Sequence, residues 1–228
     1  MLNYSKMSGS IRFRVIKRLF DIVFSLILVP PVSIIIIISS IFIKLEDGGS
    51  IFYIAERVGL FGKIFRMYKL RTMKENSPDI RLKDGSTYNS LNDPRVTKFG
   101  RLARKTSIDE LPQVFNVLKG DMSYVGPRPD TPTDLNGYTD KEKIILTVRP
   151  GITGYNQAKN RNSVSAKIKL KNDIYYVNHL SVLFDLQIIL KTVLAVIQKK
   201  NINRKKIKQN KLYILGKDGV MKSIVWKK

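Results

Sequence analysis

The sequence predicts a mostly helical α/β protein with a membrane helix near its beginning, a small β-hairpin and amphipathic helices around one main domain. Three observations support this fold class. An uncharged apolar run extends over residues 22–43. Two short runs of strand type enclose a glycine-containing turn within residues 51–70. Helical patterns then follow at residues 97–118 and 165–199.

The apolar run is dense in Ile, Leu, Val and Phe. A helix of this length extends about 33 Å, which is enough to cross a bilayer. Pro30 and Pro31 stand near its middle. Each lacks an N–H donor, and its ring clashes with the carbonyl four residues back. We therefore expect a kink, with freed carbonyls that need other partners in hydrocarbon.

Positive charges flank this run on both sides and bear on its topology. The flanking basic residues include Arg12, Arg14, Lys17 and Arg18 before it, and Lys44, Arg57, Lys63 and Arg66 after it. The positive-inside rule would keep both flanks in the cytoplasm. A re-entrant helix that breaks at Pro30 and Pro31 satisfies this rule, whereas a kinked single-pass anchor does not. The residues alone leave both topologies open.

After the membrane segment, residues 51–56 and 63–70 predict the two strands of the hairpin. Residues 74–92 are polar and predict a mobile surface loop, and residues 121–137 predict an ordered, proline-rich loop. A helix is expected around residues 138–147.

Two later helices have amphipathic patterns. Residues 97–105 predict a short basic helix, either a solvated face or a contact for phosphate or lipid headgroups. Residues 181–199 carry a broad apolar stripe, for which core packing is the default and a place in the membrane interface the alternative. Its members are Leu183, Leu186, Leu190, Val193, Leu194 and Ile197.

The composition narrows the classes of site and partner. Lys and Arg total 41 against 18 acidic residues, which gives a formal net charge of +23. Such an excess favours polyanionic partners: nucleic acid, phosphorylated substrates or an anionic membrane leaflet. The chain has no cysteine and a single histidine, His179. Disulfide scaffolds, thiolate zinc sites and two-histidine metal sites are therefore excluded.

The adjacent carboxylates of Asp109 and Glu110 are the main candidates for chemistry. Pro112 is tolerated only in the first turn of a helix, so a helix over residues 108–118 would place both carboxylates at its N-terminus. One interpretation is purely structural, because Ser107 and Glu110 have the spacing of a capping box.

The alternative interpretation is a phosphate-handling site. The basic residues Arg101, Arg104 and Lys105 come shortly before the two carboxylates in the sequence. Together with the helix N-terminus, they would attract phosphate. We expect these cations to keep both carboxylates ionised. An ionised Asp109 can attack phosphorus, and Glu110 can hold Mg²⁺.

Motifs along most of the chain resemble those of the bacterial sugar transferase family, the monotopic polyprenyl-phosphate phosphoglycosyl transferases. The resemblance covers residues 17–192, and the length is similar to that of the small bacillosaminyl-phosphate transferases. The matching stretches are Lys17–Asp21, Arg57–Gly59, Tyr68–Met73, Ser107–Gln113, Asn116–Ser123, Val125–Pro129, Val148–Gly154 and Asp173–Val177.

The resemblance implies transfer of a sugar-1-phosphate from a UDP-sugar to undecaprenyl or another polyprenyl phosphate, with release of UMP. Asp109 would be the nucleophile, Glu110 would hold the cofactor Mg²⁺, and Arg104 would bind phosphate. Arg128 is linked in the family to the polyprenyl phosphate. The remaining substrate-binding positions implied by the resemblance are Lys69, Arg149, Gln157 and Arg161.

The resemblance also implies a place for the protein and its partners. A re-entrant helix would hold it at the cytoplasmic face of the bacterial inner membrane, against anionic phospholipid. Residues 1–47 would form the N-terminal segment and membrane helix, 48–200 the cytoplasmic catalytic domain, and 201–228 a basic, loosely held tail. The product would pass to downstream glycosyltransferases of glycoconjugate assembly, and no nucleic acid would be bound.

Two departures from the family pattern concern the membrane break and the substrate pocket. Pro30-Pro31 replaces the usual Ser-Pro, and residues 160–162 read Asn-Arg-Asn instead of Gly-Arg-Asn. The identity of the sugar is therefore left open. The alternative functions are a membrane-tethered nucleic-acid binder, which the +23 charge suggests, and a scaffold without catalysis. The basic residues are spread over several segments without a nucleic-acid-binding motif, which speaks against the first.

Overall fold

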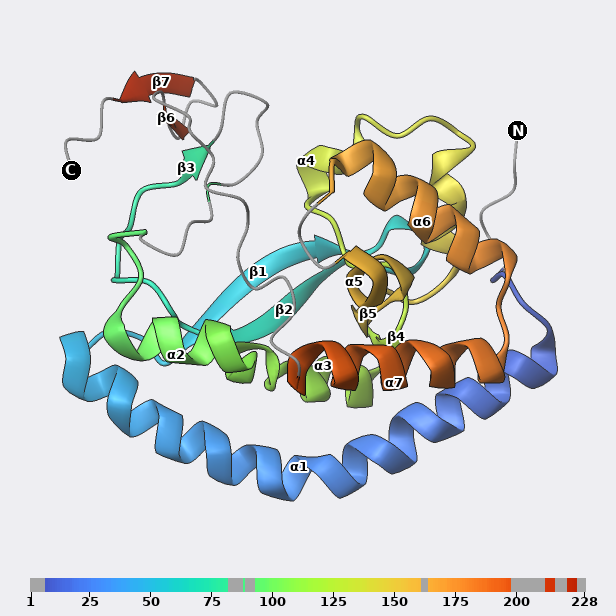
Figure 1. Cartoon of the computed structure of the whole chain (residues 1–228), viewed down its shortest axis with the longest axis horizontal. Helices are drawn as coiled ribbons and strands as arrows, with labels where there is room; N and C mark the ends of the chain where they lie inside the picture. Colours follow the sequence, from blue (N-terminus) through green and yellow to red (C-terminus); the bar gives the residue numbers. More distant parts are fainter. Residues whose placement is uncertain are drawn as a thin grey trace.

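A long bent helix underlies the rest of the protein in the computed structural model, which describes residues 7–81, 88, 93–160, 164–197, 212–215 and 221–224 (Figure 1). This helix, α1, spans Ile11–Asp47 and contains Pro30 and Pro31. It bends near its middle, as expected from two consecutive prolines, and both arms rise toward the remaining elements (Figure 1). Although the sequence predicts a break, the helix continues through the prolines. Among the described residues, it is the helix long and apolar enough to cross a membrane.

One face of α1 belongs to the protein core. Val32, Ile36 and Ile43 are buried together with Leu70 and Val114 from later elements. The opposite face exposes large apolar side chains along the length of the helix, among them Leu19, Val23, Ile27, Ile34, Ile38 and Ile41. A contiguous apolar face of this extent is typical of a surface that contacts lipid.

The predicted hairpin is confirmed. Strands β1, Phe52–Val58, and β2, Ile64–Leu70, are antiparallel, with Phe52 opposite Leu70 and Val58 opposite Ile64. A short 3₁₀ turn at Leu60–Gly62 connects them. On the inner face of the hairpin, Ala55 and Met67 pack on Val117 and Met122. The hairpin therefore covers the chain around residues 117–122.

The predicted helix at residues 108–118 is two elements. The basic helix α2, Lys98–Thr106, agrees with the prediction, and a 3₁₀ turn, η2, then spans Ile108–Glu110. Helix α3, Gln113–Lys119, begins after Pro112. Ser107 separates α2 from η2, because its left-handed backbone (φ 60°) ends α2 and turns the chain.

A parallel strand pair was missed, with one strand inside the predicted loop at residues 121–137 and the other further along the chain. Strand β4, Ser123–Val125, pairs with β5, Gly151–Thr153. The connection contains the short helix α4, Pro132–Leu135, and a 3₁₀ segment, η3, over Glu142–Thr147 in place of the predicted α-helix. The strands of this pair are too short to give an alternating pattern in the sequence.

Three helices complete the main domain: α5, Tyr155–Asn160, α6, Ala166–Asn178, and α7, Val182–Ile197. Helices α6 and α7 agree with the prediction, but core packing of the α7 stripe is wrong. Its members Leu183, Leu186, Leu190, Val193 and Leu194 are exposed, while Ile188 packs into the core; the side chain of Ile197 lies outside the described residues. The stripe therefore favours the interface alternative.

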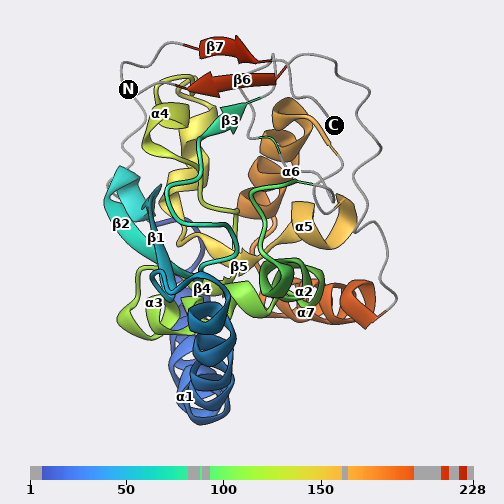
Figure 2. The same cartoon turned by 90° about the vertical axis from the view of Figure 1, so that its left-hand side faces the viewer.

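A third sheet lies away from α1 (Figures 1 and 2). It contains β3, Ile80–Arg81, β6, Leu212–Leu215, and β7, Met221–Ile224, in the order β3-β6-β7. The sequence predicted a loop at residues 74–92 and a tail after residue 200, and it missed the strands in both. Each run is short, and β3 pairs with a strand from the other end of the chain, so no local pattern predicts the sheet.

Candidate active site

Asp109 and Glu110 lie on the short turn η2 between α2 and α3. The capping-box interpretation is wrong, because the side chain of Ser107 makes no capping hydrogen bond and its backbone is left-handed. The side chain of Glu110 turns instead toward two cations. The pair is thus held by a strained turn, which is common at functional sites.

Glu110 brings together cations from two distant segments. Lys69 Nζ on β2 and Arg128 Nη2 after β4 each donate to Glu110 Oε1 at 2.8 Å. Burial would raise the pKa of Glu110, but the charges and hydrogen bonds of Arg128 and Lys69 outweigh this and hold the pKa below its usual value. Glu110 is therefore ionised at neutral pH.

Asp109 has a different environment. Burial raises the pKa of its carboxyl to about 6, and the negative charge of Glu110 adds to the effect. Lys69, Arg104 and Arg128 oppose it. With this pKa, Asp109 is mostly ionised at pH 7, as expected for both carboxylates, although it is a weaker acid than an ordinary aspartate. A desolvated carboxylate is a stronger nucleophile than a hydrated one.

Arg104 completes the cationic surroundings. Its Nε donates to the Thr72 hydroxyl at 2.9 Å, which directs the guanidinium from α2 toward the end of β2. Thr72 was missed as a site residue, although it belongs to the Tyr68–Met73 stretch. The structure therefore brings Asp109, Glu110, Arg104, Lys69 and Arg128 into one site, from four segments of the chain.

The other predicted substrate-binding residues are not all in this group. Arg149 Nε donates to the carbonyl of Gly120 at 2.8 Å, and its side chain lies near Arg18 and Asp21 on the first arm of α1. Gln157 is on α5, with its amide atoms buried and without hydrogen-bond partners in the described part of the chain. Arg161 lies outside the described residues.

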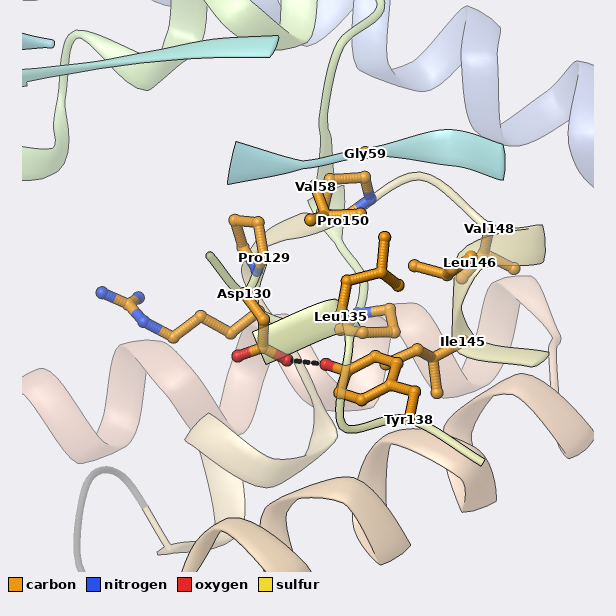
Figure 3. Close-up of a pocket in the computed structure, with 12 residues that line it drawn as sticks. Val58, Gly59, Pro129, Asp130, Leu135, Tyr138, Ile145, Leu146, Val148 and Pro150 are labelled. Carbon is orange, nitrogen blue, oxygen red and sulfur yellow. Dashed lines mark hydrogen bonds between the residues drawn. The ribbon is translucent and has the colours of Figure 1, made fainter. Parts of the chain in front are cut away.

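Arg128 and the residues after it line a small pocket, and contacts at the edge of this pocket hold the loop in place. Its walls are apolar and include Val58, Leu135 and Ile145, while Asp130 forms a polar edge (Figure 3). The hydroxyl of Tyr138 donates to Asp130, as does Lys169 Nζ at 2.5 Å. The backbone carbonyl of Asp130 also accepts the N–H of Val58 at 3.0 Å. These contacts fix the chain two residues after Arg128.

The residues at the site fit a magnesium ion that is shared with a phosphorylated substrate. Magnesium usually takes one or two protein carboxylates and completes its shell with phosphate and water. Among the described residues, no group of three or more acidic, histidine or cysteine side chains could hold a metal. Glu110 could still bind a metal through Oε2, because the hydrogen bonds that it accepts from described residues both end on Oε1.

Comparison with known proteins places this site in a family. Residues 12–199 match the profile described as bacterial sugar transferase. The chain belongs to the bacterial sugar transferase family. The adjacent carboxylates and their three cations lie inside the matched region, as does α1 from Arg12 onward.

Several known proteins are similar to this chain. The uncharacterized sugar transferase EpsL of Bacillus subtilis is 42% identical over 83% of this chain and 91% of EpsL. The exopolysaccharide production protein ExoY of Sinorhizobium fredii is 38% identical, over 79% of this chain and 84% of ExoY. The undecaprenyl-phosphate galactose phosphotransferase of Salmonella typhimurium is 40% identical over 82% of this chain, but the match spans only 41% of that longer protein.

Lys169 links Asp130, in the loop after Arg128, to a buried carboxylate of this sugar transferase that the sequence did not single out for chemistry. Asp173 on α6 is 1% exposed, and neither of its oxygens accepts a hydrogen bond from the described residues. Lys169 Nζ forms an ion pair with it at 3.3 Å. Burial raises the pKa of Asp173 to about 6, with Lys169 opposing and Asp130 adding to the effect.

Asp173→Asn is expected to become more favourable for stability as the pH rises. The pKa of Asp173 is above its ordinary value of 3.8, so the folded state binds this proton more tightly than the unfolded state. That stabilisation is complete below pH 3.8 and is lost as the pH rises through 6. It corresponds to about 3 kcal/mol. Thermal unfolding in detergent at about pH 4.5 and 7.5 should show the Tm of the variant rising relative to wild type. Asp140→Asn, at an exposed position, is the control, and an equal Tm difference at both pH values would contradict the expectation.

Proposed function

We propose that this chain is a phosphoglycosyl transferase that moves a sugar-1-phosphate from a UDP-sugar to undecaprenyl or another polyprenyl phosphate and releases UMP. The observation that carries the proposal is the ionised Asp109-Glu110 pair among Lys69, Arg104 and Arg128. Relatives named for undecaprenyl-phosphate transfer of galactose and of N-acetylgalactosamine phosphate support the same reaction class.

The first step is a displacement at the β-phosphorus of the UDP-sugar. A carboxylate oxygen of Asp109 forms a bond to this phosphorus, and the bond to the oxygen that bridges the two phosphates breaks. UMP leaves with the bridging oxygen, and the sugar phosphate remains on Asp109 as an acyl phosphate. Arg104, on the α2 side of Asp109, is placed to stabilise the charge that develops on the transferring phosphate.

The second step regenerates the carboxylate. A phosphate oxygen of the polyprenyl phosphate attacks the same phosphorus, and the Asp109 oxygen leaves. The product is a polyprenyl diphosphate sugar. Arg128 is suited to hold the lipid phosphate, because its other nitrogens can bind phosphate oxygens while one is paired with Glu110.

Glu110 would be the protein ligand of Mg²⁺. The ion would supply the charge neutralisation that an anionic carboxylate needs when it approaches an anionic diphosphate. Lys69 holds the Glu110 side chain in place from β2 at 2.8 Å. Glu110 would thus bind the Mg²⁺ of the substrate complex, and Lys69 would orient Glu110 for this role.

We also propose that α1 is re-entrant and that the enzyme lies on the cytoplasmic face of the bacterial inner membrane. Two contacts support this topology. On the first arm, Arg18 donates to the carbonyls of Val117 and Leu118 at 2.6 and 2.9 Å. At the end of the second arm, Asp47 pairs with Arg71 at 2.5 Å. Since both arms are bound to the same domain, both ends belong on one side of the bilayer. The exposed stripe of α7 would rest in the interface.

Replacing both Pro30 and Pro31 by Leu is expected to straighten α1 and move the N-terminus to the periplasm. The chain has no cysteine, so Asn3→Cys gives a single site for a membrane-impermeant maleimide. In intact cells, this site should be protected in the background with prolines and labelled in the Leu-Leu background. Glu56→Cys, on the exposed surface of β1, is the control for the cytoplasmic side. Protection of residue 3 in both backgrounds would contradict the role of the prolines.

The reaction class is tested by the nucleotide that leaves. Purified protein with Mg²⁺ and undecaprenyl phosphate is given a panel of UDP-sugars, and released UMP and UDP are separated. UMP from one of the sugars supports the proposal and identifies the donor. UDP would mean ordinary glycosyl transfer and would overturn the mechanism.

A further inference from the structure

Two acidic residues, Glu46 and Asp47, end the membrane helix α1. Carboxylates near a helix C-terminus face the negative end of the helix dipole, which is an unfavourable place for them. Each is compensated elsewhere in the domain. Asp47 pairs with Arg71 through both of its oxygens, at 2.5 and 2.6 Å, whereas Glu46 reaches the beginning of α2.

Glu46 caps α2 from a position 52 residues away in the sequence. Its Oε1 accepts the backbone N–H of Lys98, and its Oε2 accepts that of Phe99 at 3.1 Å. The hydroxyl of Thr97 accepts the next N–H, that of Gly100, at 2.9 Å. The first N–H groups of a helix have no partner within it, and a negative charge there is favourable. The carboxylate that is unfavourable for α1 is therefore favourable for α2.

Two further contacts fix α2 in the same orientation. The ring of Phe42 on α1 stacks on the ring of Phe99 at 5.7 Å between centroids, with only 4° between their planes. On the other side, Gly100 lies so close to Thr72 that a Cβ on it would be 2.1 Å from the Thr72 carbonyl oxygen. Helix α2 is thus held between the end of α1 and the segment after β2.

The position of α2 determines where Arg104 points. Arg104 follows the capped residues by less than two turns, and its Nε must meet the Thr72 hydroxyl at 2.9 Å. Rotation or fraying of α2 at its N-terminus would move this guanidinium relative to Asp109. We infer that Glu46 is a positioning residue, which acts through α2 to hold Arg104 at the transferring phosphate. The inference rests on the proposed function, in which Arg104 binds that phosphate.

The kinetic test compares Glu46→Ala with Glu56→Ala, which removes another exposed carboxylate and changes the net charge equally. Loss of a helix cap of this kind should reduce kcat/KM for UMP release about fivefold, while Glu56→Ala stays within about twofold of wild type. Glu46→Gln retains one oxygen that can accept a hydrogen bond and should fall between the two. Wild-type rates for Glu46→Ala would overturn the inference.

A double-mutant cycle separates positioning from a general loss of stability. If Glu46 acts through Arg104, Glu46→Ala should cost less than about twofold when Arg104 is already Lys. An equal loss in both backgrounds would mean that Glu46 has only a structural role, and would overturn the inference.

Hydrogen exchange of the α2 peptide gives a readout that does not depend on the reaction. The amides of Lys98 and Phe99 should exchange faster in Glu46→Ala than in Glu56→Ala, and equal exchange would exclude the cap. Wild-type protein that releases no UMP would contradict the proposed function but leave this exchange result intact, so the two failures are distinguishable.

Discussion

Asp109→Asn is expected to lower the rate of UMP release by about a thousandfold or more. Asparagine fills the same space, but its neutral amide oxygen cannot form the bond to phosphorus. Glu110 and its partners Lys69 and Arg128 would stay in place, so the loss would report on the nucleophile. The UDP-sugar, labelled in its β-phosphate, is mixed with the enzyme in the absence of polyprenyl phosphate, and the quenched protein is weighed by mass spectrometry.

Wild-type protein should gain the mass of one sugar phosphate with a stoichiometric burst of UMP, and Asp109→Asn should show neither. Asp140→Asn, which removes an exposed carboxylate, should behave as wild type. Turnover by Asp109→Asn close to the wild-type rate would exclude Asp109 as the nucleophile.

Glu110→Gln is expected to cost about a hundredfold or more and to change the response to magnesium. The substitution removes the negative charge that Lys69 and Arg128 share at 2.8 Å, and it removes the proposed metal ligand. UMP release measured over a range of Mg²⁺ concentrations should show a higher concentration for half-maximal rate. Lys69→Met is the matched variant, because it breaks one of the same ion pairs but keeps the carboxylate. A Mg²⁺ dependence that is identical in Glu110→Gln and wild type would place the metal elsewhere.

Local patterns predicted the parts of this fold that depend on neighbouring residues. The hairpin, α2, α6 and α7 follow from periodicity and turn residues. The β3-β6-β7 sheet does not, because Ile80 pairs with Ile214 at the far end of the chain and each strand is short. The prediction that the α7 stripe is buried was also wrong, because an apolar stripe has the same sequence pattern whether it faces a core or a membrane.

The site shows the same division between local and distant information. The adjacency of Asp109 and Glu110 is visible in the sequence, but the partners of Glu110 come from β2 and from the loop after β4. Ser107 misled the interpretation of the helix end, because a capping-box spacing carries no information about a left-handed backbone. Arg149 points toward Gly120 at the end of α3. This orientation depends on how α3 packs against α1, which a sequence motif does not reveal.

The shared packing of α1 with Leu70 and Val114 has a consequence for how this protein reaches its native state. In most anchored enzymes, the soluble part can complete its own interior in water and the anchor can be cut away. Here, Val32, Ile36 and Ile43 of α1 fill part of the interior of the domain. A fragment lacking residues 1–47 would present that interior to solvent and would be prone to aggregate. With α1 in the bilayer as proposed, we expect insertion of the helix and closure of the domain over it to be one event, so that bilayer entry is part of folding.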